Sequence, residues 1–259
     1  MSLTDNSNLG SGFRGYFRID AALDDELYDE VLRIRHEVYC VDLGFERVRE
    51  DARESDAYDT HSIHCLLRTA TSPHRGVGCA RLVLTDPEDR AAPLPFERTC
   101  AGVLDRSIID PARLPRERIA EVSRLAVCRA YRRRKGEEHS YVNNIEDDNF
   151  DSQGRPRFPY IPVSLYMGAI AIAAHHGIDT LFVLTEPRLA SHFARLGVRV
   201  TQIGGAVEHR GTRVPSMIDV QDVIRNMRLV MRPLWREVVS EIEHSYKIER
   251  GNDIAAVMR

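Results

Sequence analysis

An apolar segment, residues 119–128, carries a carboxylate, a hydroxyl and a guanidinium within the four letters EVSR, residues 121–124. Apolar residues on both faces of a period-two pattern are typical of a central strand that is covered on both sides. An ionised side chain in such a strand is costly unless it is paired or faces a wet cavity. Glu121 and Arg124 therefore need charged partners or a pocket, and the strand alone leaves open whether they form a structural ion pair or a reactive site.

The side-chain alternation of this strand predicts which of its groups can act together. Glu121 and Ser123 should share a face with Leu125 and Val127, whereas Arg124 should point to the other face. Desolvation raises the pKa of a buried carboxylate, and a raised pKa suits a general base near neutral pH. Glu121 is therefore the candidate base, acting directly or through a water.

Charge is distributed unevenly along the chain. The formal net charge of -3 over 259 residues hides a basic block, Arg132, Arg133, Arg134 and Lys135, and an acidic stretch within residues 146–151. A basic run suits phosphate groups or an acidic protein, and it is also common at a solvated helix start. The sequence has no zinc-knuckle, helix-turn-helix or aromatic-basic pattern, so nucleic acid is not the expected partner.

Cysteine spacing and hydropathy indicate the compartment. The five cysteines are scattered without a CxxC pair, and the N-terminus lacks the charged and apolar regions of a secretion signal. The most apolar stretch starts at Met167 and is stopped by His175 and His176, which is far short of a membrane span. These features predict a cytoplasmic protein with reduced thiols and no transmembrane helix.

The positions of the histidines and of Cys128 argue against a metal site and against a cysteine nucleophile. His61 and His64 would point to opposite faces of a strand, so we expect no metal site there. Cys128 ends an apolar strand, where a cysteine is usually a small hydrophobe rather than an acylated nucleophile.

The elements that must position these groups alternate between helices and strands. Helical spacing predicts a first helix over 24–39 with Asp24 as its cap, and period-two patterns predict an antiparallel hairpin before the EVSR strand. A further helix is expected to open in the basic block at 132–135.

Further on we expect an exposed loop at 139–160, helices at 162–176 and 188–197, strands at 180–185 and 198–204, a hairpin over 209–220, and helices near 220–229 and 234–246. This order predicts a single α/β domain of the α+β type with a mixed, mostly antiparallel central sheet flanked by helices. The expected boundaries are a flexible N-terminus at 1–14, the domain at 15–220, and a C-terminal helical extension at 221–259.

Two segments of this order resemble the GNAT acyltransferase fold. They are LAVCRAYRRRKG, residues 125–136, and FARLGVRVTQIG, residues 193–204. The first is similar to the strand and pyrophosphate loop that bind a pantetheine thioester in that family. The resemblance therefore implies that the acyl donor is bound by Leu125, Ala126, Val127, Arg132, Arg133, Arg134 and Lys135. It also implies that backbone N–H groups near 125–127 hold the oxyanion.

Four further blocks resemble acyl-homoserine-lactone synthases and long-chain N-acyl amino acid synthases. They are RHEVYCVDLGFE, ESDAYD, ARLVLT and EVSRLAV, in this order, and the resemblance runs over residues 15–220. Within that group the chain is most similar to the acyltransferases associated with PEP-CTERM/exosortase systems. Lactone synthases usually have Phe at the Tyr39 position and Trp at the Phe45 position, which argues against S-adenosylmethionine as the substrate.

This resemblance implies an enzyme that moves an acyl group from acyl carrier protein or acyl-CoA to the amine of an amino acid, with no tightly bound cofactor. The catalytic residues would be Glu121, Ser123 and Arg124, and the substrate-binding residues Arg35, Tyr39, Phe45, Asp56, Asp59 and Arg81. Arginine forks bind carboxylates bidentately, so Asp56 and Asp59 could either contact the amine substrate or form part of the scaffold. The expected partners are acyl carrier protein and a small amine, with peripheral membrane contact through a lipid product.

Three other functions stay open at this point. The first is a lactone synthase that uses S-adenosylmethionine, and the second is a non-catalytic module that binds acyl carrier protein or lipid. The third is an acetyl-CoA enzyme that acts on a small amine.

A long acyl chain would need an apolar tunnel. Small and aliphatic residues are concentrated on two segments beside the expected thioester, and they are Ala126, Val127, Val163, Leu165, Met167, Ala169, Ile170 and Ala173. Ordinary core packing explains each of these side chains equally well. The tunnel is therefore an expectation for the structure to test.

Overall fold

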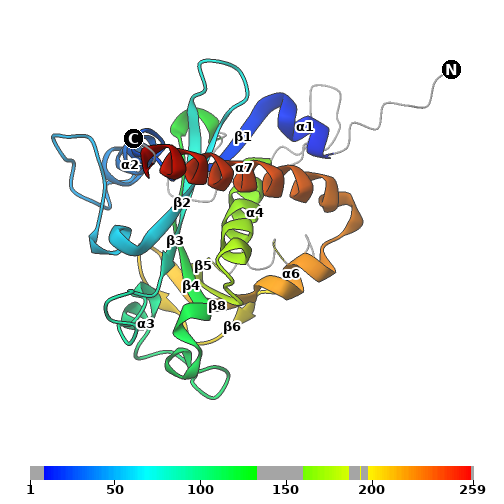
Figure 1. The fold of residues 1–259 in the computed structure, drawn as a ribbon. Coiled ribbons are helices and arrows are strands. Elements are labelled where there is room, and N and C mark those ends of the chain that lie inside the picture. Colours follow the sequence, from blue (N-terminus) through cyan, green and yellow to red (C-terminus); the bar gives the residue numbers. More distant parts are fainter. Residues whose placement is uncertain (1–8, 133–159, 187–192, 194–197, 258–259) are drawn as a thin grey trace, which may run out of the picture.

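The computed structural model describes residues 9–132, 160–186, 193 and 198–257. Its centre is an eight-stranded sheet in the order β1-β2-β3-β4-β5-β8-β6, with β7 paired to β8 (Figure 1). The strands are β1 (Phe17–Ala21), β2 (Ser62–Thr69), β3 (Gly76–Leu84), β4 (Ile119–Val127), β5 (Thr180–Thr185), β6 (Thr201–Gln202), β7 (Val207–Glu208) and β8 (Thr212–Asp219). Only β4 and β5 run parallel, so the predicted mixed, mostly antiparallel sheet is confirmed.

Helices cover both faces of the sheet. The helices are α1 (Leu9–Tyr16), α2 (Asp25–Arg35), α3 (Pro95–Thr99), α4 (Tyr160–His175), α6 (Val220–Asn226) and α7 (Arg232–Val257). One core cluster joins α1, α4, α6 and α7 to the sheet, and a second joins α2 to the opposite face (Figure 1). None of the helices in the described part of the chain has both the length and the apolar composition needed to cross a bilayer.

Helix α4 is apolar on nearly all sides because it lies between the sheet and α7. Its residues from Val163 to Ala173 are buried. A Cβ at Gly168 would lie 2.4 Å from the Cys65 sulfur of β2, so glycine at this position lets the helix approach the sheet closely. The small residues of this helix therefore serve packing first.

The predicted first helix divides into two parts. Asp24 caps α2 as expected, by accepting a hydrogen bond from the Leu27 N–H at 2.8 Å. After Arg35 the chain continues as a π-helical segment, His36–Asp42, in which the Leu43 N–H donates to the Val38 carbonyl. Such wider turns often occur at functional sites. The segment places Tyr39 against β4.

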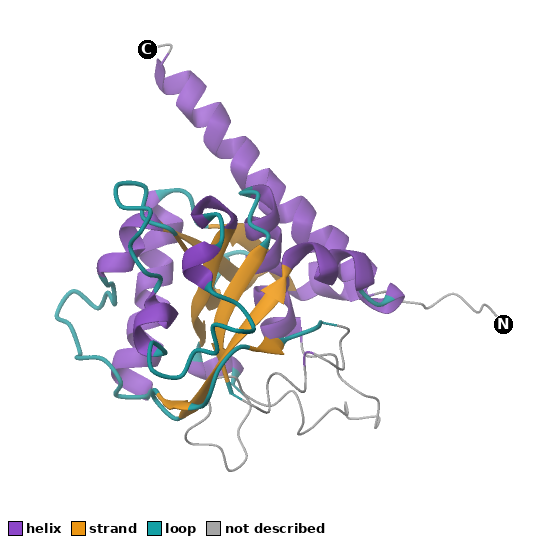
Figure 2. Cartoon of the chain, turned by 90° about the horizontal axis from the view of Figure 1, so that it is seen from below, coloured by secondary structure: helices purple, strands orange, loops and turns teal. Residues whose placement is uncertain are grey.

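Both ends of the domain differ from the expected boundaries. Residues 9–14, expected to be flexible, belong to α1, because Phe13 is fully buried in the main core. The expected C-terminal extension contains the two expected helices as α6 and the longer α7, and the α7 residues Leu234, Val238 and Ile242 are buried in the same core. Its far end extends beyond the sheet (Figure 2). The flanking segments are therefore part of the domain.

Four other expected elements fall partly or mostly outside the described residues. Of the expected strand at 198–204, Thr201–Gln202 form β6, and Gly204 pairs with Leu104 in an isolated antiparallel bridge. The expected helix at 188–197 lies outside the described residues except for Phe193. The expected loop at 139–160 and the helix expected to open in the basic block also lie outside them, except for Tyr160, which begins α4, and Arg132.

Candidate active site

A β-bulge in β4 reorganises the EVSR residues. Cys79 pairs with Ala126 and Arg81 pairs with Ser123, so one residue of β3 faces two residues of β4. Arg124 has a φ of 50°, which is unusual for a side chain larger than glycine. The extra residue places the Arg124 side chain beside that of Ser123, because both contact the same network of arginines and carboxylates.

The bulge also corrects the predicted alternation. Beyond it, Leu125 and Val127 pack into the core beneath α4, whereas Ala126 packs with α2. Glu121 and Ser123 therefore share a face with Arg124 and not with Leu125 or Val127. A strict period of two fails here because the inserted residue reverses every later side chain.

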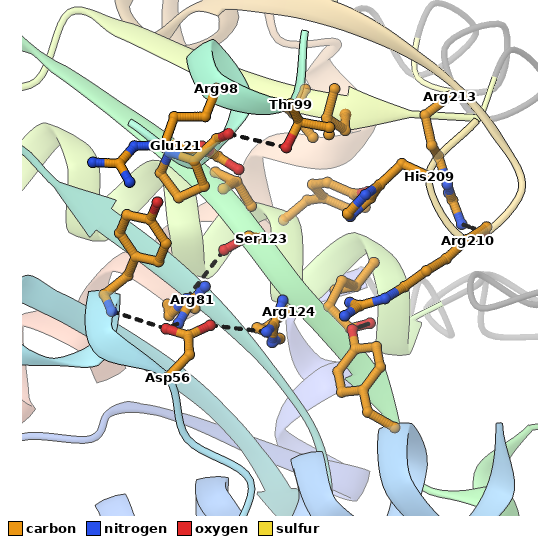
Figure 3. Close-up of a pocket in the computed structure, with 18 residues that line it drawn as sticks. Asp56, Arg81, Arg98, Thr99, Glu121, Ser123, Arg124, His209, Arg210 and Arg213 are labelled. Carbon is orange, nitrogen blue, oxygen red and sulfur yellow. Dashed lines mark hydrogen bonds and ion pairs between the residues drawn. The ribbon is translucent and has the colours of Figure 1, made fainter. Parts of the chain in front are cut away.

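A cavity of about 320 Å³ lies where β4 separates from β5 (Figure 3). The two strands pair only as far as Val122 and Val183, so their later residues diverge. The lining residues come from the π-helical segment, the 3-10 turn Ala57–His61 with its cap, β3, β4, β5, α3, α4 and the β7–β8 hairpin. They are Tyr39, Asp56, Tyr58, Arg81, Pro95, Arg98, Thr99, Glu121, Val122, Ser123, Arg124, Leu125, Tyr166, Val183, Leu184, His209, Arg210 and Arg213.

Glu121 lines this cavity with its side chain almost completely buried. The residue is 4% exposed, and its Oε2 accepts a hydrogen bond from the Phe96 N–H at 2.7 Å. Burial raises the pKa of Glu121 to about 7, although the Phe96 N–H and the charges of Arg81 and Arg124 act in the opposite direction. The carboxylate can therefore gain and lose a proton near neutral pH, as a general base must.

Helix α3 holds the donor to Glu121 in place. The Glu97 carboxylate accepts hydrogen bonds from the Leu94 N–H at 2.8 Å and from Arg116 at 2.9 Å. Phe96 stacks on Phe182 of β5 with 4.4 Å between ring centroids. Arg98 lines the same cavity and has no acidic partner among the described residues. In Figure 3 its guanidinium extends away from His209 and Arg210.

Behind the cavity lies a buried network of arginines and carboxylates. Arg35 is fully buried, and its guanidinium donates to Glu54 at 2.5 Å and bidentately to Asp59 at 2.7 and 3.1 Å. Arg81 donates to Asp56 at 2.6 Å and to Asp59 at 2.8 Å. Each charge in this network has an opposite partner, as burial requires.

The network reaches the reactive strand through two contacts. Arg81 Nε donates to Ser123 Oγ at 3.1 Å, and Arg124 donates to Asp56 at 2.8 Å (Figure 3). The Arg124 guanidinium also lies 5.6 Å from the ring centroid of Tyr39, whose hydroxyl donates to the Leu125 carbonyl at 2.7 Å. The network therefore holds the bulge of β4 against the π-helical segment.

Opposing effects determine the charge of the carboxylates. Burial acts to raise the pKa of Asp59, but the hydrogen bonds and charges of Arg35 and Arg81 outweigh burial and hold that pKa well below its usual range. The pKa values of Glu54 and Asp56 are lowered by the same kind of balance. These three carboxylates stay ionised, in contrast to Glu121.

The structure divides the predicted substrate-binding residues into two groups. Tyr39, Asp56 and Arg81 line the cavity. Arg35, Phe45 and Asp59 do not line it, and Arg35 and Asp59 lie in the network behind it. Asp59 also completes a capping box with Asp56 at the 3-10 turn Ala57–His61, which is a structural contact.

Several lining residues were missed by the sequence patterns. His209 and Arg210 come from the β7–β8 turn and Arg213 from the start of β8, on the opposite side of the cavity from Arg98 and Glu121 (Figure 3). Arg210 pairs with Glu46, and Arg213 lies 3.0 Å from Glu186. A turn with two arginines was the available signal, but such turns are usually solvated. The remaining missed residues are Tyr58, Pro95, Arg98, Thr99, Val122, Tyr166, Val183 and Leu184.

The predicted donor-binding residues lie in different environments. Leu125 lines the cavity, whereas Ala126 and Val127 are buried in the core. The Arg132 guanidinium is paired with Asp42, and Arg133, Arg134 and Lys135 lie outside the described residues. Of the predicted donor contacts, the described structure therefore places only Leu125 at the cavity.

Burial raises the pKa of every cysteine thiol of the chain. All five cysteines fall within the described residues, where they are free and buried. Burial raises the pKa of Cys128 to about 12, so its thiol stays protonated and is a poor nucleophile. The described residues contain no group of His, Cys, Asp or Glu side chains that could hold a metal ion.

A second cavity, of about 30 Å³, is entirely apolar in character. Its lining residues are Val163, Tyr166, Met167, Ile170, Phe193, Val198, Ile218, Val223, Met227 and Met231. Tyr166 also lines the larger cavity, so the two cavities share a wall. Of the eight residues expected along a tunnel, three, Val163, Met167 and Ile170, line this cavity, and the other five belong to the packed core.

Comparison with known proteins supports the fold. Residues 34–142 match the family model described as an acetyltransferase (GNAT) domain. The structure is similar to that of the acyl-homoserine-lactone synthase LasI, with a TM-score of 0.54 and 19% identity over 81% of this chain and 93% of that chain. A search of curated protein sequences found no significant match.

Two further solved structures show the same likeness. The CoA-dependent acyl-homoserine lactone synthase MesI has a TM-score of 0.53 and 21% identity over 89% of this chain and 95% of that chain. FeeM, an N-acyl amino acid synthase from uncultured soil microbes, has a TM-score of 0.53 and 14% identity over 83% of this chain and 97% of that chain. The chain therefore has a GNAT-like fold of the kind found in acyl-transferring synthases.

Proposed function

We propose that the protein transfers a long-chain acyl group from acyl carrier protein to the amine of an amino acid. The observation that carries this proposal is Glu121, a buried carboxylate with a pKa of about 7 on a cavity at the separation of β4 and β5. The four sequence blocks further support a place among the acyltransferases associated with PEP-CTERM/exosortase systems. GNAT-like acyl-transferring synthases of similar fold make both N-acyl amino acids and acyl-homoserine lactones.

The reaction requires a neutral amine. A free α-amino group has a pKa of about 8, so much of the substrate is protonated at neutral pH. Ionised Glu121 accepts a proton from the amine, directly or through a water. The amine nitrogen then attacks the thioester carbonyl carbon and forms the amide bond, while the carbon–sulfur bond breaks and the pantetheine thiol leaves with a proton. Backbone N–H groups near residues 125–127 are the proposed donors to the transient oxyanion.

The charge of the cavity supports an anionic acceptor such as an amino acid. Five arginines line it, against the carboxylates Asp56 and Glu121. Four of the five arginines already have acidic partners, and Arg98 is the exception among the described residues. We therefore assign Arg98 to the carboxylate of the amino acid, which leaves the amine free to face Glu121.

Replacing Arg98 by Gln should raise the KM for the amino acid by about tenfold to a hundredfold, because a charge-assisted hydrogen bond to the carboxylate is lost. The kcat should change much less, and Arg98→Lys should restore part of the affinity. Arg90→Gln, at an exposed arginine that does not line the cavity, serves as the matched control. Equal use of the amino acid and its decarboxylated amine by the unaltered protein would contradict the assignment.

The acyl chain is proposed to extend past Tyr166 into the apolar cavity. A volume of about 30 Å³ is too small for a long chain, so side chains must move to admit it. Met167, Met227 and Met231 line this cavity, and methionine side chains rearrange at low cost because they are unbranched and flexible. The proposal therefore predicts an induced rather than an open tunnel.

A donor series from acetyl to long acyl groups, at fixed amino acid, tests the whole proposal. Each buried methylene contributes about 0.8 kcal/mol, so kcat/KM should rise about fourfold per methylene before it reaches a plateau. Mass spectrometry of the products identifies both the acyl chain and the acceptor. Equal efficiency across the series, or a preference for acetyl, would exclude the long-chain function and favour a small-molecule acetyltransferase.

The same turnover assay identifies the acyl donor and the acceptor. Acyl carrier protein is acidic, so turnover with it should fall as salt rises, and acyl-CoA of the same chain length should be the poorer donor. A better rate with acyl-CoA and no effect of salt would exclude the carrier protein. Turnover only with S-adenosylmethionine would identify a lactone synthase, and acyl binding without any turnover would identify a binding module.

A further inference from the structure

The turn between α6 and α7 exposes two large apolar side chains. Leu229 is 76% exposed and Val230 is 62% exposed. Single exposed apolar residues are common on protein surfaces and need no explanation. Among the large exposed apolar residues of the described chain, however, these are the only two adjacent in sequence. The turn lies at the right-hand edge of the molecule in Figure 1.

Four arginines flank this apolar tip in the sequence, each within six residues of Leu229 or Val230. Arg225, Arg228, Arg232 and Arg236 are all exposed. No acidic side chain among the described residues pairs with any of them, whereas the nearby acid Glu237 is already paired with Arg14. Exposed arginines therefore flank aliphatic side chains that project into solvent.

This combination matches one kind of surface. Anionic lipid headgroups attract clustered arginines, and the boundary between headgroups and acyl chains accepts aliphatic side chains. An acidic protein surface would pair with the arginines but would not by itself give Leu229 and Val230 an apolar environment. Acyl carrier protein, in addition, must deliver its thioester to the larger cavity, and no residue of this turn lines that cavity.

The turn is also connected to the apolar cavity. Met227 and Met231, on either side of the segment 228–230, point inward and line that cavity together with residues of α4. One short segment thus has apolar groups on its inner side and a cationic, aliphatic outer side. The proposed acyl chain would reach this wall from the side of Tyr166.

We infer that the α6–α7 turn docks the protein on an anionic membrane surface, with Leu229 and Val230 entering the headgroup region and the arginines contacting lipid phosphates. A membrane at this wall would receive an acylated product directly from the apolar cavity. Docking needs no turnover, so its test is separate from that of the acyl-transfer proposal.

Co-sedimentation of the full-length protein with vesicles tests this inference. The protein should bind vesicles that contain phosphatidylglycerol much more strongly than vesicles of phosphatidylcholine alone, and added salt should weaken binding. Arg228→Gln with Arg232→Gln should lower the partition coefficient about thirtyfold, since each arginine near an anionic surface contributes about fivefold. Leu229→Ser with Val230→Ser should lower it by about tenfold or more, because both side chains leave the lipid.

A matched control separates docking from general surface effects. Arg47 and Val48 form another exposed cationic and apolar pair, remote in sequence from this turn, so Arg47→Gln with Val48→Ser should leave vesicle binding unchanged. Circular dichroism confirms that each variant is folded. Equal binding to neutral and anionic vesicles, no binding to either, or equal losses in the control and the turn variants would overturn the inference. The inference would also be overturned if the turn variants bound vesicles normally but lost affinity for purified acyl carrier protein.

Discussion

Replacing Glu121 by Gln should lower kcat by about two orders of magnitude or more, with no loss of melting temperature at pH 8. The substitution keeps the volume of the side chain, and the amide oxygen can still accept the hydrogen bond from the Phe96 N–H. It removes the group that takes the proton from the amine. A large loss of stability with normal specific activity would contradict this and assign Glu121 to the scaffold.

The pH dependence adds an independent readout. The pKa of Glu121 in the folded protein is about 7, above the ordinary glutamate value of 4.5. Between these values the folded state binds the extra proton, so this group's contribution to stability falls as pH rises from 4.5 to 7. Activity should rise over the upper part of that window, because only the ionised form is a base.

Glu121→Gln should remove this pH dependence from both the stability and the activity. Its melting temperature at pH 8 should equal or exceed that of the unaltered protein, since a buried charge has been removed. Glu97→Gln is the matched comparison, because Glu97 lies next to Phe96 but does not line the cavity. Glu97→Gln should lower the stability but keep the rise of activity near pH 7. If the activity of Glu97→Gln did not change with pH, the rise could not be assigned to Glu121.

Replacing Asp59 by Asn should destabilise the fold by about 3–5 kcal/mol, because it leaves two buried guanidinium groups without a full set of partners. Arg35 and Arg81 both donate to this carboxylate. Denaturant unfolding measures the change. Asp179→Asn removes an equally well-formed but exposed pair with Arg118, and it should change the stability little.

The same experiment distinguishes the two roles left open for Asp59. If Asp59 is a scaffold residue, the folded fraction of the variant keeps its KM for the amino acid. A raised KM with unchanged stability would instead place Asp59 in contact with the substrate. The pKa of Asp59 is lowered in the folded protein, so its contribution is present above the unfolded pKa of about 4 and is lost as pH falls. The stability difference between Asp59→Asn and the unaltered protein should therefore shrink in acid.

Local patterns in the sequence determined the main elements. Alternating apolar residues marked β4 as a buried strand, and helical spacing with Asp24 marked α2. The presence of Glu121 in that strand also followed from the sequence, since the apolar pattern of 119–128 predicted a buried central strand. These features depend on residues within a few positions of one another, so the chain itself is enough to predict them.

The facing of the side chains was decided by tertiary structure. The bulge at Arg124 arises from the pairing of β4 with β3, and no pattern within β4 marks it. It reversed the predicted faces of Leu125 and Val127. The separation of Asp56, on the cavity, from Asp59, behind it, depends on where Arg35 and Arg81 lie across the fold.

The composition of the cavity was likewise decided by the fold. Arg98 reaches the site because α3 packs on β5 through Phe96 and Phe182. Arg210 and Arg213 reach it because the β7–β8 hairpin lies beside the separation of β4 and β5. The sequence thus determined the strand and its buried charges. The partners of Arg124 come from a distant segment, since Glu54 lies 70 and Asp56 lies 68 positions away in the chain, because burial requires each charge to find an opposite one wherever the fold supplies it.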